Sequence, residues 1–249
     1  MALSTLRIDP HVHSQGSYDG HEPVELILEH AAEIGLDGVV ITDHDEIEES
    51  RYAASIAPEY GLLGIPGVEV STANGHLLAI GVSDAPEPGQ PIQETVTQVR
   101  ELDGAAVVPH PFQRSRHGVR RRHIPDADAI EVYNSMLFTG YRNRRANVYA
   151  VENAYPKVGA SDAHYLPNVG RAYTEIDLAE PVETPTDVDP ARVVERIRDG
   201  DTAIHGRRSP IRRSLRQYAK GAARKGMFEL TARTPVLPTW PASMDRTRQ

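Results

Sequence analysis

The sequence predicts an α/β fold in which short strands alternate with helices around a single barrel. Three observations support this prediction. The chain has 249 residues, a length that one α/β barrel commonly takes. Short apolar runs recur along it, and most of them end at a His, an Asp or a Glu. Helical patterns separate these runs, and such alternation is typical of βαβ units with a parallel sheet.

The apolar runs are expected to be strands that are buried on both faces, because parallel sheets covered by helices carry continuous apolar residues. In chain order they are LRI before Asp9, GVVIT before Asp43, GIPGV before Glu69, AAVVP before His110, DAIEVYN around Glu131 and KVGAS before Asp162. The run TAIHG at 202–206 is expected to be a last strand or an edge. Polar residues at the carboxyl ends of such strands converge on one rim of a barrel.

Helices are predicted between and after these strands. Residues 22–35 place five apolar side chains on one face, with Pro23 suited to the first turn and Gly35 to the C-terminal cap. Residues 92–104 repeat an apolar face. Residues 179–190 are rich in proline and are expected to be a connector, followed by a short helix that ends at Gly200.

Composition excludes several kinds of site. Cysteine is absent, so disulfides and thiolate ligands are excluded, and any metal must be held by His and carboxylates. No apolar run approaches the length of a membrane span, so we expect a soluble, cytoplasmic protein without membrane contact. The net charge of −8 disfavours broad nucleic-acid binding, except through a basic segment at 206–225.

Nine residues near the strand ends could bind metal ions: His11, His13, Asp19, His44, Glu69, His76, His110, Asp162 and His164. Six histidines and three carboxylates suit divalent ions such as Mn²⁺, Fe²⁺ or Zn²⁺. His11 and His13 can reach one ion together, because alternate residues of an extended chain project to the same side. Nine ligands are too many for one ion, so we expect a cluster in which a carboxylate such as Glu69 bridges two metals.

These motifs resemble those of the polymerase and histidinol phosphatase (PHP) superfamily over about residues 6–205. The segment DPHVHSQGSYDG is similar to its first motif and VITDHD to its second, and further matches are GVEVST with HLLAIG, VVPHPF and GASDAH. The resemblance implies a distorted (β/α)7 barrel of the TIM-like kind that binds up to three ions. We expect this PHP domain to span residues 1–205 and a basic extension to follow at 206–249.

The resemblance also implies how the ligands divide among two to three divalent ions. The first ion would be held by His11, His13, Glu69 and Asp162, the second by Glu69, His76 and His110, and the third by Asp19, His44 and His164. Many members of the family hydrolyse phosphate esters. We therefore expect a metal-dependent phosphoesterase in which a metal-bridging hydroxide attacks a phosphorylated metabolite, a nucleotide or an oligonucleotide end. Glu69, Asp162 and His164 are its expected catalytic residues.

Arginines near the rim are candidates for holding the substrate phosphate, because a guanidinium group binds phosphate bidentately. The loop after His110 carries several basic residues, and from it we select Arg114 and Arg116, the two closest to a ligand, together with Arg171 farther along the chain.

Two further polar residues adjoin the expected ligands in sequence, and the family resemblance implies two more, in IEVYN, near the metal rim. Asp9 and Asp43 are expected either to orient imidazoles or to cap loops. Glu131 and Asn134 are expected to support the rim without binding metal.

Two other functions remain compatible with this fold. One is an RNA-binding scaffold in the manner of the ribonuclease P protein subunit, and the other is an accessory PHP domain for a DNA polymerase. Scaffold members lack most ligands, whereas all nine are present here. A chain of 249 residues has no room for a polymerase, so the second role would require a partner chain. The enzyme is the favoured interpretation.

The basic extension generates the first testable prediction. Residues 206–225 hold eight basic residues and no acidic one, with Ile211, Leu215, Tyr218 and Ala222 at helical spacing. We expect an amphipathic helix that packs on the acidic body. Truncation at Gly206 should then lower the melting temperature and leave turnover of a small phosphoester nearly unchanged. If the segment is a nucleic-acid-binding arm, melting is unchanged and oligonucleotide affinity falls instead.

Overall fold

The strands of the protein form two five-stranded sheets. The computed structural model describes residues 2–113, 116–136 and 140–208, together with residues 223, 226, 227, 230 and 231. The first sheet has the order β10-β9-β1-β2-β3 and contains β1 (Leu3–Val12), β2 (Gly38–Ile41), β3 (Leu63–Gly64), β9 (Ala172–Val182) and β10 (Thr202–Gly206). The second has the order β4-β5-β6-β7-β8 and contains β4 (Gly67–Thr72), β5 (Gly75–Ile80), β6 (Ala105–Val108), β7 (Ala129–Asn134) and β8 (Lys157–Ala160). The predicted α/β class is confirmed.

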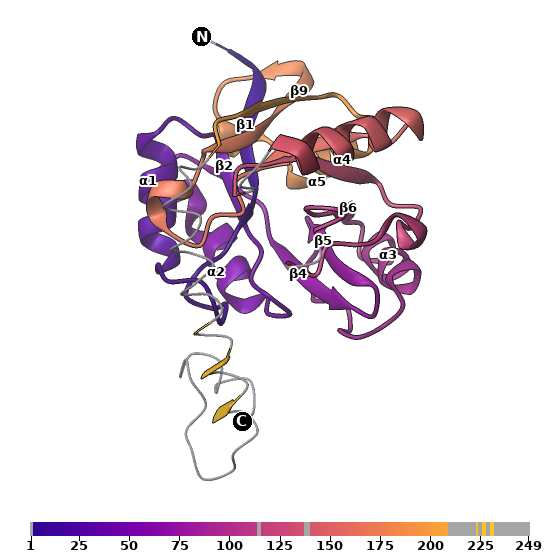
Figure 1. Ribbon diagram of the computed structural model, residues 1–249. Helices are drawn as coiled ribbons and strands as arrows, with labels where there is room; N and C mark the ends of the chain where they lie inside the picture. The colour runs from indigo at the N-terminus through magenta and orange to yellow at the C-terminus, as the bar shows by residue number, and fades with distance from the viewer. Residues whose placement is uncertain are drawn as a thin grey trace.

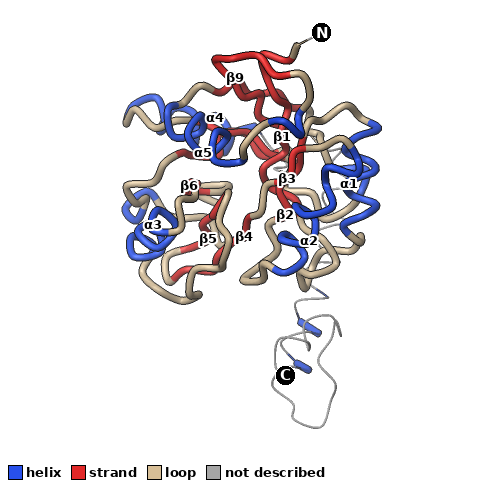
Figure 2. Tube along the Cα trace, turned by 180° about the vertical axis from the view of Figure 1, so that it is seen from behind, coloured by secondary structure: helices blue, strands red, loops and turns tan. Residues whose placement is uncertain are grey.

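Helices lie around the outside of the strands, as the blue and red tube of Figure 2 shows. They are α1 (Val24–Glu33), α2 (Glu48–Ile56), α3 (Ile92–Glu101), α4 (Gly140–Glu152) and α5 (Pro190–Asp199). The helices predicted at 22–35, 92–104 and up to Gly200 are α1, α3 and α5. None of the described helices is long and apolar enough to cross a membrane.

The ends of α1 and α5 follow their sequence signals. The α1 helix buries Val24, Ile27, Leu28 and Ala31, while Ile34, expected on the same face, is 43% exposed at its C-terminal end. Gly35 and Gly200 follow the two helices with φ of 77° and 80°, a left-handed conformation that glycine adopts without steric cost.

The sheets are mixed, which corrects the prediction of a parallel sheet. The β4 and β5 strands pair antiparallel, because only two residues, Ala73 and Asn74, connect them and a parallel crossover needs a dozen or more. The β5–β6, β1–β9 and β9–β10 pairs are antiparallel as well. The proline-rich connector is also shorter than predicted, since residues 179–182 belong to β9. The run TAIHG is β10, at the edge of the first sheet.

The two sheets meet at the carboxyl ends of several strands. Isolated parallel bridges join Val12 to Ala163, beyond β8, and His44 to Glu69 of β4. Figure 1 shows β1 and β2 on one side of this junction and β4 to β6 on the other. The described residues form no continuous closed sheet, so the predicted barrel is not confirmed as such. The predicted helix at 206–225 falls largely outside the described residues.

An apolar core lies beneath this junction. It combines Leu6 and Ile8 of β1 with Leu78 and Ile80 of β5, and Ile197 of α5 covers it. Each of these five side chains is at most 1% exposed. Full burial of one such side chain stabilises a fold by roughly 1.5–3 kcal/mol. The polar residues at the strand ends therefore stand on a closely packed base.

The hydroxyl group of Thr174 links the two sheets and generates a prediction. It donates a hydrogen bond to the carbonyl of Gly159 in β8 (2.8 Å) and accepts one from the Gly159 amide (3.0 Å). Thr174 is 1% exposed, so Thr174→Val leaves two buried backbone groups unpaired. We expect a loss of about 2–4 kcal/mol in the free energy of unfolding, measured in urea. The control Thr97→Val, on the exposed surface of α3, should cost less than about 0.5 kcal/mol.

Candidate metal centre

All nine candidate metal ligands lie together at the junction of the two sheets. His11 is the last residue but one of β1, His13 and Asp19 follow that strand, and the other six come from β4, β5 and the segments after β2, β6 and β8. His76 is the second residue of β5, and the antiparallel direction of that strand brings its amino end to the same rim. Eight of the nine residues are buried, and Asp19 has a side chain that is 12% exposed.

Glu69 is the central residue of the site, because its two carboxylate oxygens face different imidazoles. Its Oε2 atom lies 3.5 Å from His11 Nε2, 3.3 Å from His13 Nε2 and 3.2 Å from His44 Nδ1. Its Oε1 atom lies 2.9 Å from His76 Nδ1 and 3.0 Å from His110 Nε2. A carboxylate with imidazole nitrogens on both oxygens has the arrangement that a bridging ligand needs.

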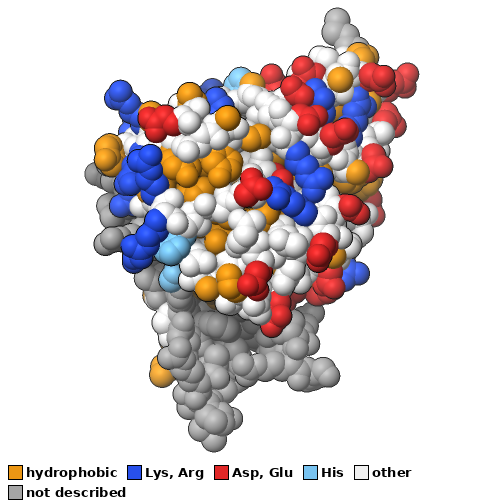
Figure 3. Space-filling view, turned by 90° about the vertical axis from the view of Figure 1, so that its right-hand side faces the viewer, with side chains coloured by type: hydrophobic (Ala, Val, Ile, Leu, Met, Phe, Trp, Pro, Cys, Tyr) orange, Lys and Arg blue, Asp and Glu red, His pale blue; other side chains and the backbone are white. Residues whose placement is uncertain are grey.

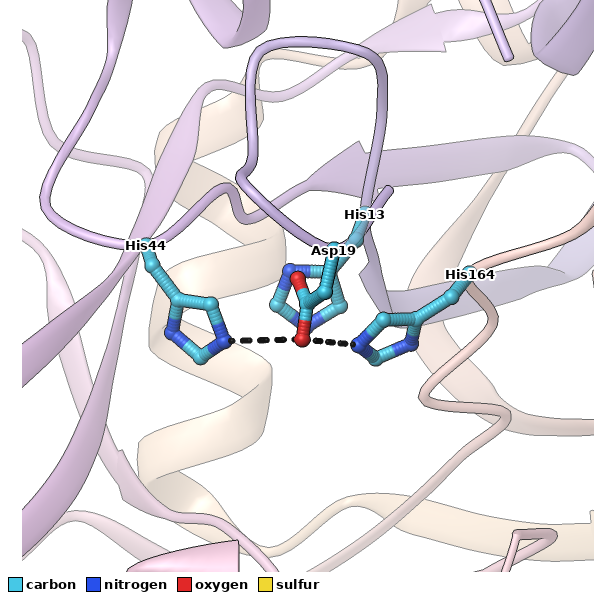
Figure 4. Close-up of side chains that lie close together, drawn as sticks. All are labelled: His13, Asp19, His44 and His164. Atoms are coloured by element: carbon cyan, nitrogen blue, oxygen red, sulfur yellow. Dashed lines mark hydrogen bonds and ion pairs between the residues drawn. The ribbon is translucent and has the colours of Figure 1, made fainter. Parts of the chain in front are cut away.

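Asp19 is a second carboxylate with imidazoles around it, and Figure 4 shows it with His13, His44 and His164. Its Oδ2 atom lies 3.0 Å from His164 Nε2 and 3.7 Å from His44 Nε2. The hydroxyl of Ser17 donates a hydrogen bond to Oδ1 at 2.9 Å, which holds the carboxylate in place.

Asp162 is a third carboxylate that lies close to imidazoles of the site. Its Oδ1 atom is 3.7 Å from the Nε2 atoms of both His11 and His13. Asn134 donates a hydrogen bond to Oδ2 at 2.9 Å, and Arg116 forms an ion pair with the same oxygen.

The residues present fit divalent cations. Four groups place one ligand atom from each member within 4.8 Å of one another: His13 with Asp19, His44 and His164; His11 with Glu69 and His110; His11 with His13 and Asp162; and His44 with Glu69 and His76. The Nε2 atoms of His11 and His13 lie only 3.1 Å apart. Nδ1 of His11 hydrogen-bonds to Glu131, which directs the lone pair of Nε2 toward Glu69.

Two of the candidate ligands have a left-handed backbone. The φ angles of Asp162 and His110 are 55° and 29°. Such conformations cost a non-glycine residue about 1–3 kcal/mol and persist where the surrounding structure fixes them. Here hydrogen bonds do so: the amide of Asp162 donates to the carbonyl of His11 (2.9 Å), and the amide of His110 donates to Glu131 (2.6 Å).

Burial and mutual charge set the protonation of the site. Burial lowers the pKa of His11, but the charge of Glu69 and the hydrogen bonds of Glu131 and Glu69 outweigh it and raise that pKa to about 9. For His76 burial wins over the attraction of Glu69, and the pKa falls to about 4. Burial raises the pKa of Glu69, but the charges of the surrounding imidazoles hold it well below its usual value. The carboxylate of Glu69 therefore stays ionised, while the raised pKa of His11 keeps that imidazole protonated at neutral pH.

Glu131 and Asn134 support the site as predicted. Glu131 accepts hydrogen bonds from the ring of His11 (3.1 Å), the amide of His110 (2.6 Å) and the side chain of Asn134 (3.0 Å). Both residues are at most 1% exposed. One carboxylate thus fixes the positions of two candidate ligands from different strands.

Asp9 and Asp43 cap loops, one of the two roles considered for them. The carboxylate of Asp9 accepts from the amides of Ser161 and Gly170, each at 2.9 Å. Asp43 accepts from the amide and the hydroxyl of Ser14 at 2.7 and 2.5 Å. Burial raises the pKa of Asp9 to about 6 and that of Asp43 to about 7.

The three arginines selected for substrate binding have different positions. Arg116 lies within the site against Asp162, with a side chain that is 13% exposed. Arg171 donates a hydrogen bond to the carbonyl of Arg208 (2.7 Å), at the end of β10. Arg114 lies outside the described residues.

Sequence analysis did not identify Tyr18 as part of the site. Its ring stacks on His44, with centroids 4.8 Å apart and an angle of 11° between the planes. Its position next to Asp19 was the available signal. His117 stacks in a similar way on His76, with centroids 5.2 Å apart.

Comparison with known proteins identifies the family. The PHP domain matches residues 9–142, and a PHP-associated region matches residues 140–202. Because the PHP domain covers more than half of the sequence, this chain belongs to the PHP domain family. An uncharacterised protein of Methanocaldococcus jannaschii is 25% identical over 193 residues, which are 74% of this chain and 76% of that protein.

Solved structures share the fold. A two-domain protein from Bacteroides vulgatus that contains a predicted PHP-like metal-dependent phosphoesterase has a TM-score of 0.64 at 20% identity, covering 88% of this chain and 70% of that chain. The lesion-specific endonuclease Q of Pyrococcus furiosus has a TM-score of 0.50 at 17% identity, covering 80% of this chain and 57% of that chain. At these identities the likeness concerns the fold.

The contacts of Glu131 generate the prediction of this subsection. Glu131→Gln removes the negative charge that orients His11 and the amide of His110, while it keeps the size of the side chain. Loss of such a partner typically costs about 10- to 100-fold in metal affinity. A titration of chelated protein with Mn²⁺, followed by calorimetry, should show this loss. The control Glu152→Gln changes a carboxylate that is 58% exposed and should bind as wild type does. Unchanged affinity in Glu131→Gln would contradict the assigned role.

Proposed function

We propose that this chain hydrolyses phosphate esters with the help of two to three divalent metal ions, which we take to be Mn²⁺, Fe²⁺ or Zn²⁺. The observation that carries the proposal is that imidazole nitrogens lie close to both carboxylate oxygens of Glu69. Membership of the PHP domain family supports it. Bound divalent ions would supply an activated water at neutral pH and neutralise charge on the phosphoryl oxygens.

We divide the ligands according to the three carboxylates, Glu69, Asp19 and Asp162, around which the imidazoles lie. His11, His13, Glu69 and Asp162 would hold one ion, and Glu69 would share a second ion with His76 and His110. The geometry around Asp19, with His44 and His164 near its Oδ2 atom, supports a third set that His13 adjoins. Glu69, Asp162 and His164 are the residues that we assign to catalysis.

The remaining polar residues position these ligands and the substrate. Glu131 hydrogen-bonds to Nδ1 of His11, which leaves Nε2 of that ring facing Glu69. Arg116 lies in position to bind a phosphoryl oxygen, since its guanidinium group forms an ion pair with Asp162. We assign Arg116 to substrate binding and keep Arg114, which lies outside the described residues, and Arg171 as further candidates.

The substrate is a phosphate ester of a small metabolite, a nucleotide or an oligonucleotide end. An endonuclease among the structural relatives supports a phosphodiester of a nucleic acid as one such substrate. A purely structural scaffold is disfavoured, because ionised groups that are buried without use cost stability. We place this activity in residues 1–205, which we interpret as a distorted barrel, with residues 206–249 as an extension.

Metal content and hydrolysis of an activated aryl phosphodiester test the proposal together. The purified protein should carry two to three equivalents of a transition metal by plasma emission spectroscopy. His11→Ala and Glu69→Ala should lose metal and at least about a hundredfold in kcat/KM, since one lost electrostatic contact in the transition state is commonly worth about 3 kcal/mol. The control His205→Ala changes a side chain that is 45% exposed and should retain both. Less than half an equivalent of metal in the wild type would refute the proposal.

A further inference from the structure

Six arginines lie on two neighbouring segments beside the metal centre, and ring contacts join these segments at Arg121 and Arg145. They come from the loop after β6 and from α4, and we call them the arginine surface: Arg120, Arg121, Arg122, Arg142, Arg144 and Arg145. Five of the six are exposed, and Arg142 is partly buried. Figure 3 shows Lys and Arg side chains gathered along the left edge of this face, next to hydrophobic side chains and histidines.

Aromatic rings connect the loop to α4. The guanidinium carbon of Arg121 lies 5.4 Å from the ring centre of Tyr149, and that of Arg145 lies 4.4 Å from the ring centre of Phe112. Phe112 and Tyr149 meet edge to face, with centroids 5.6 Å apart. Each of these rings thus has a guanidinium group over its face, which holds the two charges in place.

The arginine surface is continuous with the metal centre. Phe112 follows the candidate ligand His110 by two residues. Farther along the same loop, Arg116 pairs with Asp162, and the ring of His117 stacks on His76. The loop after β6 therefore contacts candidate ligands through Arg116 and His117 and the guanidinium group of Arg145 through Phe112.

The charge of this surface is opposite to that of the whole protein. The net charge is −8, yet residues 110–125 and 135–151 contain no Asp or Glu. Glu152, at 4.0 Å from Arg121, is the carboxylate that pairs with the arginine surface among the described residues. Exposed apolar side chains lie on the same helix: Tyr141 is 69% exposed and Val151 63%. Arginines interleaved with rings suit a flexible polyanion whose bases can stack.

We propose that the arginine surface binds the phosphate backbone of a single-stranded nucleic acid and leads its end to the metal centre. The inference rests on the proposed function and names its substrate class. Arginine contacts to successive phosphates would hold the strand, and Tyr141 would offer a ring to a base. A small phosphorylated metabolite would have no use for six arginines outside the centre.

Binding of a fluorescein-labelled oligothymidylate to the full chain, measured by anisotropy in EDTA, tests the inference without catalysis. Arg121→Gln/Arg145→Gln should weaken binding by on the order of tenfold and reduce the slope of log K against log salt by about 1 to 1.5. The control Arg7→Gln/Arg51→Gln makes the same change of charge at side chains that are 51% and 54% exposed on β1 and α2. It should bind as wild type does. Arg144→Glu, which stacks on no described ring, is a second variant that should weaken binding without changing the melting temperature.

The outcomes separate the two proposals. Equal binding by wild type and by both arginine-surface variants, or an equal loss in the control, overturns the inference even if the aryl phosphodiester is hydrolysed. Selective loss in the arginine-surface variants supports it. Failure of metal binding or of hydrolysis in the wild type removes the proposed function, while the anisotropy result still decides whether this surface binds nucleic acid.

Discussion

The buried carboxylate of Glu69, surrounded by five imidazoles, is the constraint on which the rest of the structure depends. Its side chain is 1% exposed, and a carboxylate leaves water at a cost of several kcal/mol unless opposite charge compensates it. Asp162 and Glu131 add further negative charge within the same enclosed region. Protons on imidazoles provide part of the compensation, as the raised pKa of His11 shows. Divalent cations would provide it at neutral pH without holding those protons, so the donor set is suited to them.

Such a cluster needs a scaffold that cannot relax around it. Backbone hydrogen bonds make the scaffold rigid where the two sheets meet. The amide of Glu69 donates to the carbonyl of Asp43, and the amide of His13 donates to the carbonyl of Ala163. The antiparallel β4–β5 hairpin adds a second fixed relation, because it sets His76 opposite Ser71 in register and so beside Glu69. The apolar core below prevents movement toward the interior. The direction of the strands, their register and the packing of the core together fix the positions of the candidate ligand atoms.

Local patterns in the sequence predicted the parts of this arrangement that local rules govern. The helix ends at Gly35 and Gly200 and the ligand-bearing strand ends are of this kind. Strand direction depends on the turn at Ala73 and Asn74, and its consequence for the sheet is visible only in three dimensions. The α4 helix was missed because it buries Asn143, Ala146 and Ala150 and lacks a stripe of large apolar residues.

The roles of polar residues were harder to predict than their membership of the site. Asp9 and Asp43 adjoin candidate ligands in sequence, yet their carboxylates accept hydrogen bonds from backbone amides. Tyr18 became part of the site through ring stacking, which depends on the path of the loop after β1. Side-chain direction in loops depends on contacts between distant segments. Adjacency in sequence therefore predicted that these residues lie near the site, but not which groups they contact.

At this rim the carboxylates are buried and the arginines of the arginine surface are mostly exposed. These two groups act on an anionic substrate in different ways. The carboxylates of the centre are buried, so a phosphate that approaches within a few ångströms meets net negative charge until cations or protons balance it. The arginines lie outside, where their attraction extends over roughly 8–10 Å at physiological salt. If the arginine surface binds phosphates as proposed, a substrate with several phosphates would be attracted before it reaches the centre, whereas one with a single phosphate would gain little from these arginines. Electrostatic capture by the surface and charge compensation in the centre are then separate requirements, and only the second involves the imidazoles around Glu69.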